Sequence, residues 1–330
     1  MTAKILFVVS MHRSGSSLLT KGLECFDLDL GDNLMPPAND NPKGFFEDLD
    51  VVALNDEILN ICDYQWTLIS QEPRVIPENL VSKYLEQAKA LIDVKLTHNN
   101  VKDYFVIKDP RLCRTLPIWI KACEQLNIDF KTVFISRNFN EVAISLLNRN
   151  GIAFEGGYSL WLDYTKSALG YFKQFEIEPL FIKLDSFISL MQKNMINIGQ
   201  FLERKINDEK YNIFETEFYN PNLLNKNKNK NKNINILNSP LSKAINNIES
   251  ATILTQGQIS HLLNEITEVE LIQPSTLKAM YIQLEWHRSK ESEVLREIID
   301  KLNDKMTKQK ENIENIKNLS EEVLKNINNN

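Results

Sequence analysis

The segment Ser10–Ser17 combines residue types that bind anions, and it follows a short apolar run. Where a strand ends and a helix begins, free backbone N–H groups and the positive end of the helix dipole point at one spot. A glycine lets the backbone come close, serine hydroxyls donate, and an arginine adds a planar fork for phosphate or sulfate oxygens. Serines that only cap the helix are the alternative. The residues expected to bind the anion are Arg13, Ser14, Gly15, Ser16 and Ser17.

A nucleotide triphosphatase loop is the obvious competing interpretation of this segment. That loop requires the pattern GxxxxGK[ST], in which the lysine reaches the outer phosphates and the hydroxyl holds Mg²⁺. No Gly-Lys-Ser/Thr occurs here. The pattern therefore favours an anion site that uses Arg13 rather than a magnesium-bound triphosphate.

Charged residues also follow two other apolar runs. Arg137 ends the segment TVFISR, and Ser145 stands eight residues later, two helical turns into the next stretch. The two can converge on one phosphate; an ordinary helix start capped by an asparagine is the alternative. Lys108 ends YFVIK and is followed by Asp109 and Arg111, for which plain salt bridges are the alternative.

The elements that must position these residues are strands alternating with helices. Compact apolar runs at 4–10, 104–107, 132–136 and 179–182 have the character of buried parallel strands, and helical periodicity marks 49–61, 80–96 and 186–203. Residues 32–44 are rich in Pro, Asn and Asp and are expected to be irregular. The pattern predicts a three-layer α/β fold with a central, mostly parallel sheet that binds ligands at the carboxyl ends of its strands.

Composition narrows the function further. The net charge of -6 argues against a nucleic-acid surface, and no run approaches the roughly 20 apolar residues of a membrane helix. The four cysteines lie far apart without a CxxC pair, which favours reduced thiols over disulfides or zinc. With no recognisable signal peptide, we expect a cytoplasmic protein without a metal site.

The C-terminal third changes character. The tract 225–233 alternates Asn and Lys and predicts a flexible loop rather than a polyanion site. From about 275 the sequence lacks Gly and Pro and has apolar residues at heptad spacing. We expect a long helix that forms a coiled coil, in a homodimer or with a partner protein; a helix folded back on its own domain is the alternative. The expected organisation is 1–220, a flexible loop 221–240, a helical extension 241–274 and the long helix 275–330.

Four motifs together resemble sulfotransferases that use 3′-phosphoadenosine 5′-phosphosulfate (PAPS). MHRSGSSLL resembles their phosphosulfate loop, and TVFISRNFNEVAISL places an arginine and a serine in the register that binds the 3′-phosphate. IKDPR is similar to the KDP segment of tyrosylprotein sulfotransferases and the KDPR segment of bacterial glycan-type enzymes, and GDNL…NPKGFFE is similar to a stretch of that bacterial family. The resemblance covers residues 4 to 205 and implies a P-loop-like fold.

The resemblance also implies roles for single residues. Arg13 and the loop hold the phosphosulfate, Arg137 and Ser145 hold the 3′-phosphate, and Lys108 stabilises the leaving oxygen. Glu47 stands where relatives have the catalytic base; Asp48 is the second candidate, and for both a helix-start acid pair is the alternative. The main cytosolic family has a histidine after this lysine where the present chain has Asp109, so a histidine base is not expected there. His12 is a candidate donor to the leaving group or a packing residue.

The predicted function is transfer of a sulfuryl group from PAPS to a hydroxyl acceptor, with a glycan or glycolipid as the expected acceptor and 3′-phosphoadenosine 5′-phosphate as the product. No metal is expected, because side chains supply the cations. Two alternatives stay open. One is a P-loop nucleotide kinase, and the other is a non-catalytic scaffold that acts through its C-terminal helix.

Overall fold

A computed structural model of the chain describes residues 3–39, 41–62, 66, 67, 69, 78–98, 101, 103–219 and 240–272. These residues belong to one compact unit that extends to Met280. Residues 221–239 of the predicted Asn/Lys-rich loop (221–240) lie outside the described residues, and so does the predicted helix from 275 to 330. The last residue of the predicted loop, Pro240, begins α10. Among those described, no helix is both long enough and apolar enough to cross a lipid bilayer.

A five-stranded sheet in the order β2-β1-β3-β4-β5 is the centre of the described fold. All neighbours are parallel except β5, which pairs antiparallel with β4 at the edge. The predicted α/β class with a mostly parallel sheet is therefore confirmed. Because the chain crosses from β2 past β1 to β3, the order reverses between β1 and β3, which is where such sheets bind ligands. The strands are β1 (Lys4–Val9), β2 (Tyr104–Lys108), β3 (Phe130–Ser136), β4 (Leu180–Lys183) and β5 (Thr252–Ile253).

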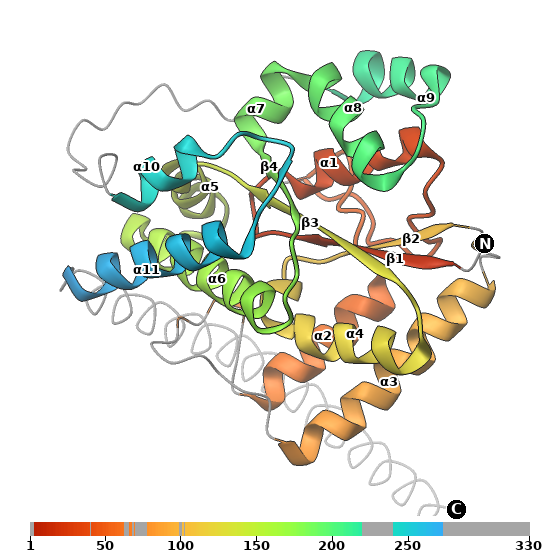
Figure 1. The fold of residues 1–330 in the computed structure, drawn as a ribbon, viewed down its shortest axis with the longest axis horizontal. Coiled ribbons are helices and arrows are strands. Elements are labelled where there is room, and N and C mark those ends of the chain that lie inside the picture. The colour runs from red at the N-terminus through yellow and green to blue at the C-terminus, as the bar shows by residue number, and fades with distance from the viewer. Residues whose placement is uncertain are drawn as a thin grey trace, which may run out of the picture. The chain divides into compact units, whose positions relative to one another are not determined.

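The central strands are buried on both faces, as their unbroken apolar sequences predict. In β1, Ile5, Phe7 and Val9 point into one hydrophobic cluster, whereas Leu6 and Val8 point into the other. All five side chains are fully buried. The sheet is thus the middle of three layers, and Figure 1 shows helices on either side of it.

The two helical layers differ in size. The larger layer packs on the cluster around Phe7, and the smaller layer packs on the cluster around Leu6. The larger layer contains α2 (Leu49–Ile61), α3 (Glu78–His98), α4 (Leu112–Leu126), α5 (Phe139–Asn150), α6 (Phe154–Gln174), α10 (Pro240–Asn247) and α11 (Gln256–Ile272). The smaller contains α1 (Ser16–Leu23), α7 (Leu184–Ser189), α8 (Met191–Leu202) and α9 (Asp208–Ile213), with a 3₁₀ turn at Glu24–Phe26 and a π-helical turn at Phe214–Phe218.

The helix expected over 186–203 is interrupted. Helix α7 ends at Ser189, Leu190 leaves the helical conformation with φ −128° and ψ 44°, and α8 begins at Met191. The Asn194 amide donates to the carbonyls of Ser186 and Leu190, so it satisfies groups exposed by the break. Neither Gly nor Pro marks the interruption, which is why periodicity alone predicted one continuous helix.

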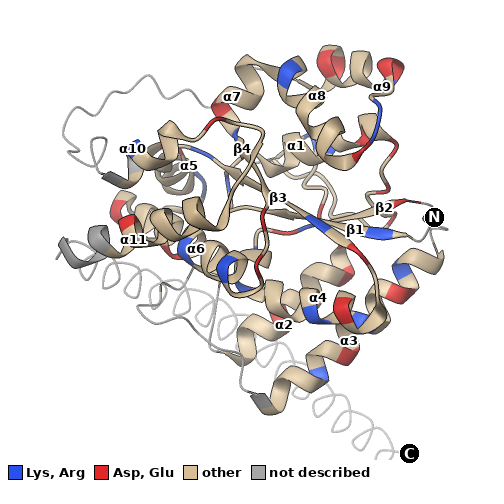
Figure 2. Cartoon of the chain, in the orientation of Figure 1, with Lys and Arg blue, Asp and Glu red and all other residues tan. Residues whose placement is uncertain are grey.

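Charged residues are spread over the helical layers. Figure 2 shows acidic and basic residues interspersed along α3, and neither sign covers a continuous face in this view. The described residues between 32 and 44 form no helix or strand and take part only in isolated bridges, such as the one between Leu34 and Asp48. This irregular stretch lies between the 3₁₀ turn at Glu24–Phe26 and the start of α2 at Leu49.

Candidate functional site

The loop between β1 and α1 has the geometry of an anion cradle. Gly15 precedes α1 in the left-handed conformation, with φ 84°, and Arg13 is also left-handed, with φ 66°. A Cβ at Gly15 would lie 2.5 Å from the buried side chain of Leu184, so only glycine fits this turn. The Ser14 hydroxyl is buried, and it neither donates nor accepts a hydrogen bond among the described residues. These features suit a bound group that brings its own oxygens.

The structure brings the two predicted phosphate motifs together. The Arg13 Nε donates to the Ser145 hydroxyl at 2.9 Å, although the two residues are 132 positions apart in sequence. Arg137 Nη1 donates to the Arg13 carbonyl at 3.1 Å, and its Nε donates to Glu141 at 2.7 Å. Parallel strands β1 and β3 are neighbours, so the loops that follow them meet at one edge of the sheet.

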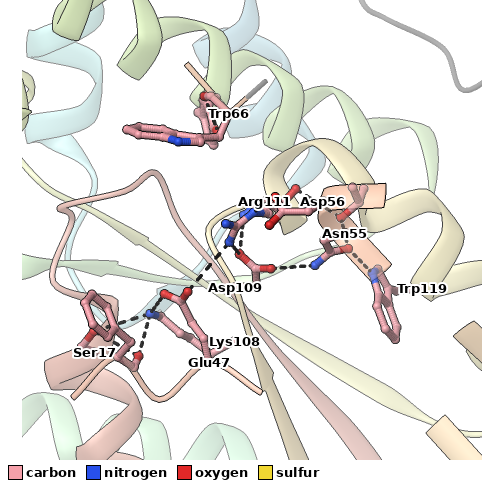
Figure 3. A network of polar contacts seen from close by, with 12 residues as sticks. Ser17, Glu47, Asn55, Asp56, Trp66, Lys108, Asp109, Arg111 and Trp119 are labelled. Carbon is pink, nitrogen blue, oxygen red and sulfur yellow. Dashed lines mark hydrogen bonds and ion pairs between the residues drawn. The ribbon is translucent and has the colours of Figure 1, made fainter. Parts of the chain in front are cut away.

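Lys108 connects this loop to the candidate base. It is the last residue of β2, and its Nζ donates to Glu47 Oε1 at 2.6 Å and to the Phe45 carbonyl at 2.8 Å. The Ser17 hydroxyl lies 3.5 Å from the same nitrogen and itself donates to the Phe45 carbonyl. Figure 3 shows Lys108 between Ser17 and Glu47. One buried ammonium therefore contacts both the start of α1 and the carboxylate.

Backbone strain at Phe46 orients these partners. Phe46 is left-handed, with φ 56°, a conformation that an aromatic residue seldom adopts. It allows the carbonyl of the preceding residue and the side chain of Glu47 to reach the same lysine. The Phe46 ring packs edge-on against Phe218, and Lys43 donates to the carbonyls of Glu217 and Phe218. The π-helical turn thus holds the 41–47 segment in place.

The surroundings of Glu47 make it a stronger base than an ordinary carboxylate. Burial raises the pKa of its carboxyl group, and the negative charge of Asp109 raises this pKa further. Lys108 and Arg111 act in the opposite direction, but the pKa remains above its ordinary value. A carboxylate with a raised pKa accepts a proton from a hydroxyl more readily.

Asp48 is occupied by structural contacts. Its carboxylate caps α2 by accepting from the backbone N–H groups of Asp50 and Val51, at 3.0 and 3.3 Å. Its other oxygen lies 2.7 Å from the Lys95 ammonium. The sequence left open whether Glu47 or Asp48 is the base. Of the two, Glu47 is the one whose partner, Lys108, also contacts Ser17 of the anion loop.

A buried network stands behind Lys108. Asp109 accepts from Asn55 Nδ2 at 2.8 Å and from the Arg111 backbone N–H and Nη1 at 2.9 and 3.0 Å. Asn55 in turn accepts from Thr115 and Trp119, at 2.8 and 2.9 Å. The sequence did not reveal Asn55: it lies at a buried position of α2 and would be expected to hold an apolar residue.

His12 packs among aromatic side chains. Its ring centroid lies 4.7 Å from that of Trp66 and 5.7 Å from that of Tyr164, and its Nε2 is buried without a hydrogen-bond partner among the described residues. Burial lowers its pKa well below the ordinary value, and nearby cations, chiefly Arg111 and Lys108, lower it further. His12 is therefore neutral at physiological pH.

A cavity of about 220 Å³ opens beside Arg137. Lys183 lines it at the carboxyl end of β4, and its ammonium donates to the carbonyl of Asn246 at 3.1 Å. The rule that identified Lys108 and Arg137, a cation at a strand end, would also have found Lys183; Trp161 and Asn246 in the same wall gave no sequence signal. A cavity of about 530 Å³ lies at the opposite, amino-terminal edge of the sheet and includes none of the predicted site residues.

Comparisons with known proteins find similarity among solved structures. No family model matches the chain, and no curated protein matches it. Among solved structures, the chain is similar to the sulfotransferase domain from the olefin synthase of Synechococcus PCC 7002. The similarity covers 81% of this chain and 94% of that domain, with a TM-score of 0.40 and 17% sequence identity.

Proposed function

We propose that this protein is a sulfotransferase that moves a sulfuryl group from PAPS to a hydroxyl group, with a saccharide as the expected acceptor. The observation that carries the proposal is the position of Lys108. Its ammonium contacts Glu47 at 2.6 Å and lies 3.5 Å from Ser17 of the anion loop. A proton acceptor, a fixed cation and an anion cradle are thus adjacent, which is what transfer from an anionic donor to a neutral hydroxyl requires.

The residues present fit the two charged groups of PAPS. The buried hydroxyl of Ser14 has no partner among the described residues, and Gly15 leaves the backbone N–H groups of the α1 start accessible to an anion. Arg137 and Ser145 both form hydrogen bonds with Arg13 of this loop. A guanidinium and a hydroxyl at this position suit the 3′-phosphate. When bound, PAPS supplies an activated sulfuryl group. The proposal requires no metal ion, since Arg13, Lys108 and Arg137 supply positive charge.

In this proposal Glu47 accepts the proton of the acceptor hydroxyl as its oxygen attacks sulfur. Lys108 stabilises the negative charge that develops on the oxygen that leaves sulfur. The left-handed backbone at Phe46 holds the carboxylate against the ammonium before substrate arrives, so little reorganisation accompanies the reaction.

The first test is calorimetric titration with 3′-phosphoadenosine 5′-phosphate, against ATP with Mg²⁺, for the wild type and for Arg137→Ala. Tight, metal-independent binding that the substitution weakens supports the proposal. Preference for ATP with Mg²⁺ supports a P-loop kinase instead, and binding of neither nucleotide supports a scaffold. Turnover is then followed as release of 3′-phosphoadenosine 5′-phosphate from PAPS, with water or a panel of saccharides as the acceptor.

A further inference from the structure

Glu47 uses only one of its two carboxylate oxygens to bind Lys108. Oε1 accepts the hydrogen bond from the lysine at 2.6 Å. Oε2 accepts no hydrogen bond among the described residues. Its ion pair with Arg111 Nη1 is 3.9 Å long, beyond hydrogen-bonding distance. An oxygen left open in this way can receive a proton from a hydroxyl.

Arg111 is close enough to block that oxygen but is held elsewhere. Its Nε donates to Asp56 at 2.6 Å, and its Nη1 donates to Asp109 at 3.0 Å. Guanidinium groups readily form two parallel hydrogen bonds with one carboxylate. Figure 3 draws the 3.9 Å ion pair between Arg111 and Glu47 as a dashed line. Without these two aspartates, a small rotation would shorten this ion pair to a hydrogen bond.

Asp109 is itself rigidly placed. Its side chain is fully buried, and Asn55, fully buried as well, donates to it at 2.8 Å. The amide orientation of Asn55 is fixed, because its Oδ1 accepts from both Thr115 and Trp119 and its nitrogen must therefore face Asp109. A buried polar network in which every member is satisfied has one well-defined geometry.

We propose that Asp109, anchored by Asn55 and assisted by Asp56, is a positioning residue that keeps the ion pair between Arg111 and Glu47 at 3.9 Å, too long for a hydrogen bond, and so leaves Glu47 Oε2 open to the acceptor hydroxyl. The inference rests on the proposed function for the role of Glu47 as base, but the hydrogen-bonding arrangement it describes exists without any nucleotide. The charged groups that face Glu47 are Lys108 from β2 and Asp109 and Arg111 from the turn after it.

The test combines Asp109→Asn with Arg111→Met in a double-mutant cycle. In Asp109→Asn, Arg111 is expected to move onto Glu47, and turnover of PAPS should fall at least about tenfold. This is part of the ~10²–10⁴-fold rate increase that a general base supplies. Arg111→Met should then raise turnover in the Asp109→Asn protein, although the same substitution does not raise it in the wild type. The expected result is therefore that Arg111→Met increases turnover in the Asp109→Asn protein but not in the wild type. If Arg111→Met leaves turnover unchanged or lowers it in the Asp109→Asn background, Asp109 does not restrain the arginine and the inference is wrong.

Because Asp109 is buried, its substitution could disturb folding. A second variant at an exposed position therefore repeats the test. Asp56 is 44% exposed on α2, and Asp56→Asn releases the Nε of Arg111 without touching the core. It should lower turnover in the same direction as Asp109→Asn but by a smaller factor. Glu57→Gln is the matched control: it removes the same charge from the next residue of α2, which pairs with Lys83 rather than Arg111, and turnover should not change.

A direct reading of the Glu47 proton separates this inference from the proposed function. The carboxyl titration is followed by difference infrared spectroscopy of the nucleotide-free protein, with Glu47→Gln to assign the signal. Loss of the Asp109 charge lowers the pKa of Glu47 by itself, so the informative quantity is the rise of this pKa caused by Arg111→Met. That rise should be larger in the Asp109→Asn protein than in the wild type, whether or not the protein binds PAPS. If the wild type fails to bind 3′-phosphoadenosine 5′-phosphate, the proposed function is wrong, but the positioning role of Asp109 is not contradicted. If Arg111→Met raises the Glu47 pKa equally in the wild type and in the Asp109→Asn protein, the positioning role is overturned.

Discussion

At the scale of single residues, neighbouring side chains of the same type have different surroundings. Glu47 and Asp48 are adjacent carboxylates, yet Glu47 contacts Lys108 whereas Asp48 caps α2 and contacts Lys95. The sequence identified both as candidates, but their difference depends on which cation each one reaches. That information arises only when β2 and α3 are packed against the same segment.

The adjacent pair gives a direct prediction. Glu47→Gln should lower turnover of PAPS by roughly 10²–10⁴-fold while nucleotide binding is retained, because the base is lost and the cradle is not. Asp48→Ala is the matched control and should leave turnover within a few-fold. It should instead reduce the free energy of unfolding by about 1–2 kcal/mol through loss of the helix cap. Equal losses of turnover in the two variants would contradict the assignment of the base.

His12 gives a prediction about pH. Its pKa in the folded protein lies well below the ordinary value of 6.5, chiefly because the ring is buried. As pH falls below about 6.5, the unfolded chain takes up a proton at this residue that the folded chain does not, so stability decreases with falling pH. Urea unfolding at about pH 5 and about pH 7.5 should show a smaller stability difference in His12→Gln than in the wild type. NMR of the wild-type imidazole should show a neutral ring throughout this range; titration near 6.5 would contradict the prediction.

At the scale of elements, hydrophobic pattern predicted more than any other property. The expected helix at 49–61 has these boundaries in the structure, and the four expected strands are present. Their apolar runs are long and bounded by turn residues, so local signals and packing agree. The short edge strand β5 was not predicted, because it depends on a distant partner, β4. The break at Leu190 was not predicted either, because neither Gly nor Pro marks it; the amide of Asn194, four residues later, satisfies the exposed carbonyl.

A substitution at Gly15, just before α1, tests the conformation of the anion loop. Gly15→Ala would place a methyl group 2.5 Å from Leu184 and impose a left-handed φ on alanine, so we expect a loss of about 1–3 kcal/mol in stability and weaker nucleotide binding. Gly170→Ala is the matched control within α6, where no atom lies within 4 Å of the added Cβ. That variant should gain about 0.5–1 kcal/mol, since alanine is the better helix former. Thermal unfolding and calorimetry measure both effects, and similar behaviour of the two variants would exclude a special role for the Gly15 turn.

At the scale of the whole molecule, the site is an outcome of sheet topology. Lys108 ends β2, whereas Arg13 and Arg137 follow β1 and β3. These strands are neighbours in the order β2-β1-β3. The sequence predicted that these residues lie at strand ends, but alternation of strands and helices does not specify strand order. The network around Asn55 could not be predicted for the same reason, because it joins α2 to the start of α4 across 60 residues.

Removal of the C-terminal part tests the predicted domain organisation. The compact unit ends at Met280 and contains every predicted site residue, so a chain of residues 1–280 should bind 3′-phosphoadenosine 5′-phosphate within about twofold of the full chain. If the heptad pattern forms a coiled coil, analytical ultracentrifugation should find the full chain as an oligomer and the shortened chain as a monomer. Loss of nucleotide binding in the shortened chain would instead assign the last fifty residues to the site.

The hydrogen bond between Arg13 and Ser145 also has a consequence for the newly made chain. The two residues are 132 positions apart, and ribosomes add about 5–20 residues per second. Ser145 is therefore synthesised roughly 7–26 s after Arg13. Until Ser145 leaves the ribosome, the nascent polypeptide has an anion loop but an incomplete set of the residues proposed to bind the second phosphate. A translating polysome would not sequester the nucleotide donor, and premature termination before this point would yield fragments that do not compete for it.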